Sequence, residues 1–155
     1  MKKKRPDSID PRRSALMARV RQKHSAPELE VRRILRVLSV PYRLHRKSLP
    51  GTPDICIHSL KRVIYVHGCF WHRHHGCKKA TTPKTRRAFR LDKFARNIAR
   101  DQANMSAARK LGWRPVIVWE CQCKNVEKLT ARLARLLPSP RKGPIQGVRR
   151  TIDRG

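Results

Sequence analysis

Apolar residues recur along this chain with two different periods, and the changes of period predict the order of its elements. Over residues 25–39 they return every three or four positions, after a proline and an acidic residue typical of the first turn of a helix. The same spacing recurs over residues 91–112, where a glycine ends the pattern, and again over residues 125–137. Three helices are therefore expected.

Short apolar runs between these helices predict strands. The four runs are residues 42–45, 54–57, 62–66 and 115–119. Residues 48–53 make a turn, whereas residues 67–87 show no periodicity, and a loop of that length in a compact domain is usually functional. The order helix, three strands, helix, strand, helix predicts an α/β/α layered domain with a mixed sheet.

The chain has 155 residues, which is enough for one domain with one core. We expect this domain to span residues 13–137, with a basic, flexible arm at 1–12 and a basic, disordered tail at 138–155. Lys and Arg number 39 and Asp and Glu number 10, so the formal net charge is +29. So large an excess makes a polyanion the expected partner, and nucleic acid is the first candidate.

The same composition argues against a membrane protein or a secreted one. No apolar run approaches the length of a spanning helix, and no apolar stretch follows the basic residues 1–7 as it would in a secretory signal. We therefore expect a cytoplasmic location, where thiols stay reduced. The five cysteines are then better interpreted as metal ligands or core residues than as disulfides, and Cys56, in the middle of a predicted strand, is expected in the core.

The loop at 67–87 begins with two cysteines and four histidines within eleven residues. Structural zinc takes four such ligands in a closed tetrahedron. Cys69 and Cys77 would supply two and a nearby histidine the third, while Cys121 or Cys123 would supply the fourth and fasten the loop to the far end of the sheet. The alternative, a metal-free loop with solvated histidines, leaves so dense a cluster unexplained.

An acidic residue, Asp54, opens a predicted strand directly after the turn at 48–53. In a chain with few acids, a carboxylate there is a candidate ligand for a hard cation such as Mg²⁺, which can polarise a phosphoryl oxygen. A neutral histidine from the loop would suit the activation of water. Taken alone, a Pro–Asp pair is more often an ordinary turn.

Three strings of residues together resemble the very-short-patch-repair (Vsr-type) DNA mismatch endonucleases. They are SLPGTPD at 48–54, HGCFWH at 67–72, and WEC at 119–121 together with Trp113. The similarity runs from about residue 13 to 137. It implies a restriction-endonuclease-like fold of the PD-(D/E)xK type, with an αβββαβ core and a structural zinc site. It also implies Mg²⁺-dependent cleavage of one strand, 5′ to the thymine of a T·G mismatch, the product of deaminating 5-methylcytosine.

The resemblance also implies roles for individual residues. Asp54 would bind Mg²⁺ together with the backbone carbonyl of Val66. His72 would activate water, and His67 would be a second active-site histidine. Glu28 would support the site from its helix, although an ordinary acid in a first turn would look the same.

Two further groups of residues follow from the same resemblance. The implied zinc ligands are Cys69, His74, Cys77 and Cys121. The implied DNA wedge, which enters the base stack beside the mismatch, consists of Met17, Phe70 and Trp71. Three positions depart from the family pattern: the spacing leaves His75 as an alternative to His74, Val66 replaces a threonine, and Arg90 stands where an aromatic residue contributes to the wedge.

Two other functions stay open at this point. One is a restriction- or mobile-element-associated endonuclease of the same fold with another DNA substrate, and the other is a zinc-containing nucleic-acid binder without activity. The resemblance favours double-stranded DNA with a T·G mismatch as the partner, a monomer, a bacterial nucleoid location, and mismatch-repair proteins as further candidate partners.

Overall fold

The structure, a computed structural model, describes residues 23–138. Its elements are α2 (Ala26–Val37), β1 (Arg43–Leu44), β2 (Ile55–Ile57), β3 (Arg62–His67), α3 (Arg87–Lys110), β4 (Arg114–Trp119) and α4 (Val126–Leu136), with short 3-10 helices η1 (His58–Leu60) and η2 (Glu120–Lys124). The arm expected at 1–12, the predicted wedge residue Met17 and residues 139–155 of the expected tail lie outside the described residues.

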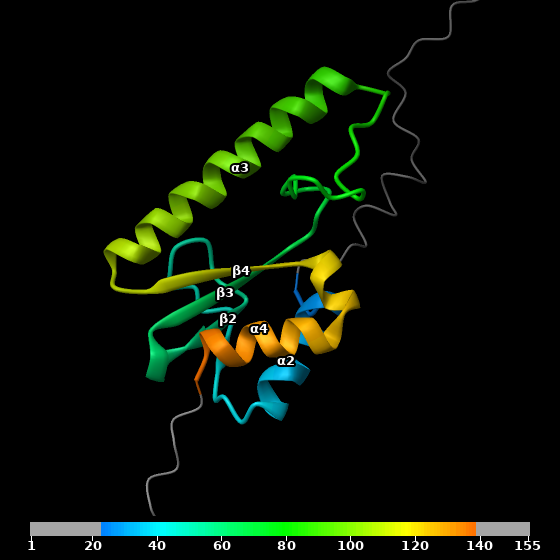
Figure 1. Cartoon of the computed structure of the whole chain (residues 1–155). Helices are drawn as coiled ribbons and strands as arrows, with labels where there is room; N and C mark the ends of the chain where they lie inside the picture. The colour runs from blue at the N-terminus through cyan, green and yellow to red at the C-terminus, as the bar shows by residue number, and fades with distance from the viewer. Residues whose placement is uncertain (1–22, 139–155) are drawn as a thin grey trace, which may run out of the picture.

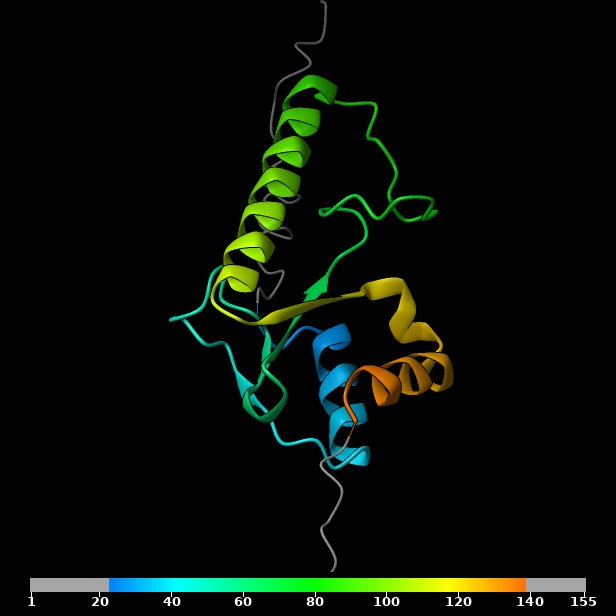
Figure 2. The ribbon, with the colours of Figure 1, turned by 60° about the vertical axis from the view of Figure 1, so that its left-hand side comes forward.

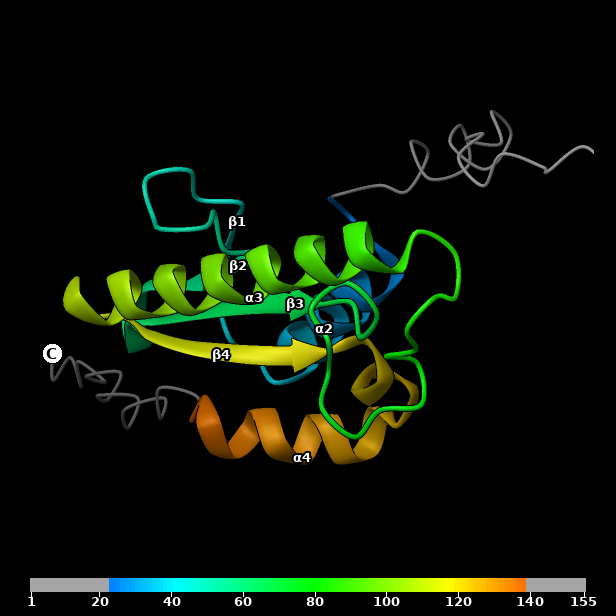
Figure 3. The ribbon, with the colours of Figure 1, turned by 90° about the horizontal axis from the view of Figure 1, so that it is seen from above.

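The four strands form one sheet in the order β1-β2-β3-β4 (Figure 1). The pairs β1–β2 and β2–β3 are antiparallel, whereas β3 and β4 run parallel. Helix α3 covers one face of the sheet, and α2 and α4 lie together on the other, as the views from the side and from above show (Figures 2 and 3). The mixed sheet between two helical layers confirms the predicted α/β/α order.

The larger core lies between the sheet and the pair α2 and α4. Both helices are amphipathic, and each begins at a side-chain cap: Ser25 accepts from the amide of Glu28, and Asn125 accepts from that of Lys128. The buried residues of this core are Val31, Ile34, Leu35, Val40, Ile55, Ile57, Ile64, Val116, Val118, Leu129, Leu133 and Leu137. It fixes the sheet against one helical layer.

The face under α3 holds a smaller core. Its buried members are Cys56, Val63, Tyr65, Ala108 and Trp113. Of the 24 residues of α3, only Phe94 and Ala108 are buried. Cys56 is fully buried, as predicted for a core thiol. Since so little of α3 packs on the sheet, the remainder of this helix is free to face the loop that precedes it.

Most element boundaries lie within two residues of the predicted ones, with one exception, the start of α3. Helix α3 begins at Arg87, four residues before its predicted start. Strand β1 is one residue shorter at each end than predicted. The 3-10 helices were not predicted. Within residues 23–138, every helix is too short or too polar to cross a lipid bilayer.

Candidate active site and metal centre

The antiparallel pairing of β2 and β3 brings Asp54 against the end of β3. Asp54 directly precedes β2, and the backbone N–H of Val66 donates to its Oδ2 at 2.7 Å. Burial raises the pKa of Asp54, and the nearby charge of Glu28 raises it further, while the Val66 amide and His45 act in the opposite direction. A buried carboxyl group whose charged form lacks full compensation is suited to accept a cation.

Asp54 opens into a cavity of about 1140 Å³ between the carboxyl end of β3, the loop and α3. Val66, His67 and His72 line the same cavity, so the structure brings these three predicted active-site residues together with Asp54. The polar residues that α3 contributes to the wall are Lys93, Asn97, Arg100, Asp101 and Asn104. Positive and hydrogen-bonding groups therefore face the carboxylate across a space large enough for a phosphate and its neighbours.

His72 is held by an acid from α3. Its Nδ1 lies 2.5 Å from Oδ2 of Asp101, and because a carboxylate only accepts, Nδ1 is the donor. The ring of His67 stacks on His72 with centroids 3.9 Å apart. Burial and then the charge of His72 lower the pKa of His67 to about 4, against the opposing effect of Asp101. In neutral His72, Nε2 is therefore the nitrogen left to accept a proton, beside a neutral His67.

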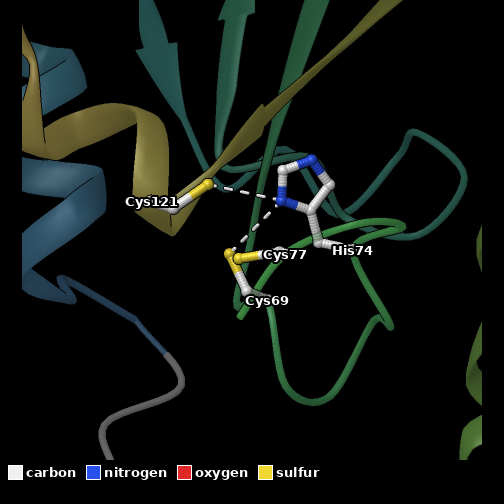
Figure 4. A group of neighbouring side chains, drawn as sticks. All are labelled: Cys69, His74, Cys77 and Cys121. Atoms are coloured by element: carbon white, nitrogen blue, oxygen red, sulfur yellow. Dashed lines mark hydrogen bonds between the residues drawn. The ribbon is translucent and has the colours of Figure 1, made fainter. Parts of the chain in front are cut away.

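The predicted zinc ligands come together at the start of the loop and in η2 (Figure 4). The ligand atoms of Cys69, His74, Cys77 and Cys121 all lie within 4.8 Å of one another. Nδ1 of His74 is 3.6 Å from the Cys69 sulfur and 3.3 Å from the Cys121 sulfur. A tetrahedral zinc with ordinary bond lengths separates its ligand atoms by about 3.5–3.8 Å, so this donor set fits zinc.

Charge considerations support the same assignment. Burial raises the pKa of Cys69 to about 12, so a thiolate there needs a cation beside it. Burial also raises the pKa of Cys123 to about 11, and its thiol donates to the carbonyls of Pro27 and Trp119. The structure thus places Cys121 in the cluster and Cys123 outside it, while His75 is exposed.

Glu28 lies beside the cavity rather than in its wall. Its side chain is 1% exposed, and its Oε2 accepts from the backbone N–H of His24 at 2.7 Å. Its Oε1 is 3.1 Å from Nε2 of His45 and 3.6 Å from the Arg32 guanidinium. The backbone N–H of His45 in turn donates to the Asp54 carbonyl, so Glu28 is linked to the active site through His45, which directly follows β1. His24, Glu28 and His45 also form a group that could hold a metal ion.

The two predicted wedge residues of the loop lie at the mouth of the site. Phe70 and Trp71 line the cavity and are half-buried, their rings edge to face with centroids 5.0 Å apart. Arg90 is half-buried on α3, and its Nε is buried without a hydrogen-bond partner among the described residues. The third predicted wedge residue, Met17, lies outside the described part of the chain.

Sequence reasoning gave no role to three residues that the structure places at the site. Asp101 holds His72, and His45 joins Glu28 to Asp54. Trp119 stacks on the ring of His74 at 4.3 Å and meets His67 edge to face at 5.5 Å, so one ring links the metal centre to the histidine pair. For Asp101, the one usable signal was an acid within a strongly basic helix.

Comparison with known protein families gives a match over the first half of the chain. A family model described as DNA mismatch endonuclease Vsr matches residues 7–79. This region contains the Asp54 motif and the cysteine-and-histidine loop as far as Lys79.

Similar proteins extend the likeness over most of the domain. The type II nicking enzyme V.XorIIP of Xanthomonas oryzae pv. oryzae is 45% identical over 132 residues, which are 84% of this chain and 96% of that protein. The DNA mismatch endonuclease Vsr of Escherichia coli K12 is 40% identical over 118 residues, 76% of this chain and 75% of that protein. The type II nicking enzyme V.NmeAIP of Neisseria meningitidis serogroup A is 37% identical over 126 residues, 81% of this chain and 89% of that protein.

The fold also resembles that of a solved endonuclease structure. The catalytic domain of the homing endonuclease I-Bth0305I matches with a TM-score of 0.51 and 17% sequence identity, over 72% of this chain and 92% of that one. At this identity the likeness concerns the fold alone, and it agrees with the restriction-endonuclease-like core expected from the sequence.

Proposed function

This chain belongs to the Vsr family of DNA endonucleases, and we propose that it nicks one strand of duplex DNA 5′ to the thymine of a T·G mismatch with the help of Mg²⁺. The observation that carries the proposal is the meeting of Asp54 and His72 in one cavity, from positions 18 residues apart in a chain with only 10 acidic residues. A cation-binding carboxylate and a water-activating imidazole are the two groups that metal-assisted phosphodiester hydrolysis requires.

The carboxylate of Asp54 and the backbone carbonyl of Val66 would hold the cation. Both residues line the cavity, and hard oxygen ligands are those that Mg²⁺ prefers. Burial raises the pKa of Asp54, and a bound cation would offset that effect by favouring the charged form. When bound, Mg²⁺ would polarise the scissile phosphate and lower the pKa of a nearby water.

His72 would take the proton of the attacking water at Nε2. Asp101 accepts from Nδ1 of His72, which fixes the tautomer and stabilises the imidazolium that proton transfer produces. His67, whose pKa is lowered to about 4, stays neutral at the pH of cells and adds no competing charge beside that imidazolium. Its stacking on His72 restricts the rotation of the catalytic ring.

The four ligands Cys69, His74, Cys77 and Cys121 would hold structural zinc. Their donor set is complete without water, which is typical of structural rather than catalytic zinc. Zinc there would join the loop that carries Phe70 and His72 to η2 at the end of β4. Glu28 would support Asp54 from the other side through His45.

Phe70 and Trp71, with Met17 from the N-terminal segment, would form the wedge that selects the mismatch. Inserting apolar side chains between base pairs costs unstacking energy, and this cost is least where a pair is already mismatched. The excess of 29 positive charges would supply the phosphate attraction that carries no base preference. An enzyme of this kind would act on chromosomal DNA at the nucleoid.

The test is a panel of labelled duplexes that differ only at one base pair. Zinc-loaded protein, with its metal content measured, is mixed with T·G, T·A and C·G duplexes at low salt, with and without Mg²⁺. We expect nicking of the thymine strand of the T·G duplex alone, and only with Mg²⁺. Equal cutting of matched duplexes would favour an endonuclease with another substrate, and binding without any cutting would favour a nucleic-acid binder; either result overturns the proposal.

A further inference from the structure

One face of α3 holds the tip of the metal-binding loop at three successive points. Phe94, Asn97 and Asp101 follow one another at intervals of three and four residues, so they project from the same side of the helix. Asp101 binds His72, and the side-chain amide of Asn97 donates to the carbonyl of Trp71 at 3.2 Å. Two neighbouring residues of the loop are thus fastened to two neighbouring turns of α3.

Phe94 provides the third point of attachment through its ring. Its centroid lies 5.3 Å from that of Phe70 and 6.2 Å from that of Trp71, and both contacts are edge to face. The guanidinium of Arg73 lies 4.8 Å above its ring. Phe94 is 2% exposed, whereas Phe70 and Trp71 are half-buried, so Phe94 is the inner member of this three-ring cluster.

The position of Phe94 on α3 is unusual for a buried residue. Only one other residue of this helix, Ala108, is buried, and Ala108 packs on the sheet four turns further along. Phe94 therefore owes its burial to the loop rather than to the sheet. An aromatic ring at this point fixes the direction of the two outer rings, because edge-to-face pairs favour particular relative orientations.

We infer that Phe94 is a positioning residue, which orients the Phe70–Trp71 pair for insertion into DNA and links that insertion to the placement of His72 through α3. The inference rests on the proposed wedge. Rings that are already oriented lose little conformational entropy when they enter the base stack. More of the energy of their contacts with the bases therefore remains to separate the two stacked base pairs. Since Trp71 and His72 are held by the same helix face, a correctly seated wedge also sets the catalytic imidazole.

The experiment replaces the ring and keeps an apolar side chain. Phe94→Leu is compared with Phe89→Leu, a matched change on the same helix. The Phe89 residue is 52% exposed, and its ring lies under the guanidinium of Arg86. Each protein is given a T·G duplex and the same duplex with an abasic site beside the mismatch, where no stacking needs to be broken. The readouts are the single-turnover nicking rate, the fluorescence of 2-aminopurine placed beside the mismatch, and the zinc content.

We expect Phe94→Leu to nick the T·G duplex about tenfold more slowly, the effect of losing one to two ring pairs, and to give a smaller 2-aminopurine signal. On the abasic duplex it should stay within about threefold of the wild type, because the lost ring contacts mainly serve insertion into an intact stack. Phe89→Leu should match the wild type on both duplexes. If Phe94→Leu lost zinc, Phe94→Met would keep the apolar volume with a more adaptable side chain and take its place.

Two results would overturn the inference: equal rates and equal fluorescence for Phe94→Leu and wild type, or an equal loss on both duplexes with zinc retained. The fluorescence measurement needs binding but no cutting. A wild type that binds and unstacks the T·G duplex without nicking it would therefore refute the proposed function alone, and Phe94 would still be tested.

Discussion

Gly51 lies where the turn at 48–53 comes closest to α3. Its φ is +67°, and a Cβ added there would stand 2.5 Å from Nδ2 and 2.7 Å from Cγ of Asn104. Gly112, at the end of α3, has a similar φ of +79°, but a Cβ there would meet nothing within 4 Å. Alanine substitutions at these two glycines therefore share the cost of a positive φ, and only the one at Gly51 adds a steric clash.

The shared cost is that of holding alanine in the left-handed region, about 1–2 kcal/mol. At Gly51 the new methyl group must also displace the Asn104 side chain, and overpacking of this kind costs a further ~1–3 kcal/mol. Gly51→Ala should therefore lower the free energy of unfolding by about 2–5 kcal/mol, and Gly112→Ala by about 1–2 kcal/mol. Since Gly51 and Asn104 both line the cavity, Gly51→Ala should also slow nicking, whereas Gly112→Ala should not.

The assay is urea unfolding of the two zinc-loaded variants and the wild type, followed by intrinsic tryptophan fluorescence. The midpoint for Gly51→Ala should lie clearly below that for Gly112→Ala, at an unchanged slope. Coincident midpoints would contradict the close approach of the turn to α3, and with it the position of the strand start that carries Asp54.

Two further predictions concern the histidine pair and the metal centre. Asp101→Asn should reduce the nicking rate by about 10²-fold without loss of zinc, because an amide cannot stabilise the His72 imidazolium as a carboxylate does. Single-turnover nicking rates check this prediction. An unchanged rate would show that Asp101 has no part in catalysis. Cys121→Ser should lower the zinc content and the midpoint of thermal unfolding, whereas the matched Cys123→Ser should leave the zinc content unchanged. Metal analysis of both variants checks this prediction. Loss of zinc from the Cys123 variant would reverse the ligand assignment.

Much of the fold follows from periodicity alone. Helices α2 and α4 bury a regular apolar stripe, and β2, β3 and β4 are short runs of large apolar residues, so their existence and order were predicted correctly. The first turn of α3 was missed because it packs on no core: Phe89 and Leu91 are exposed there, and the spacing of apolar residues is weak. The family match and the shared fold confirm a Vsr-type endonuclease with a restriction-endonuclease-like core.

The site was only partly predictable, because some of its residues are recognisable by local motifs and others by distant contacts. Asp54 and the cysteines could be picked out from the sequence because they stand in short, recognisable motifs. The roles given to them stay predictions until activity is measured. The choice between His74 and His75 depends on which ring turns toward Cys121, and that contact joins residues 47 positions apart. Asp101 carries only a weak local signal, an acid in a basic helix, and its role appears only when His72 is placed beside it.

The central claim is that Asp54 and His72 act on one phosphodiester bond while the metal centre only holds the loop in place. The most direct measurement compares Asp54→Asn with the wild type for binding and for Mg²⁺-dependent nicking of the same T·G duplex, at equal zinc content. We predict binding within about threefold of the wild type and a nicking rate reduced by at least about 10³-fold, since the charged ligand of the cation is lost. Nicking by Asp54→Asn at a rate close to that of the wild type would contradict the account.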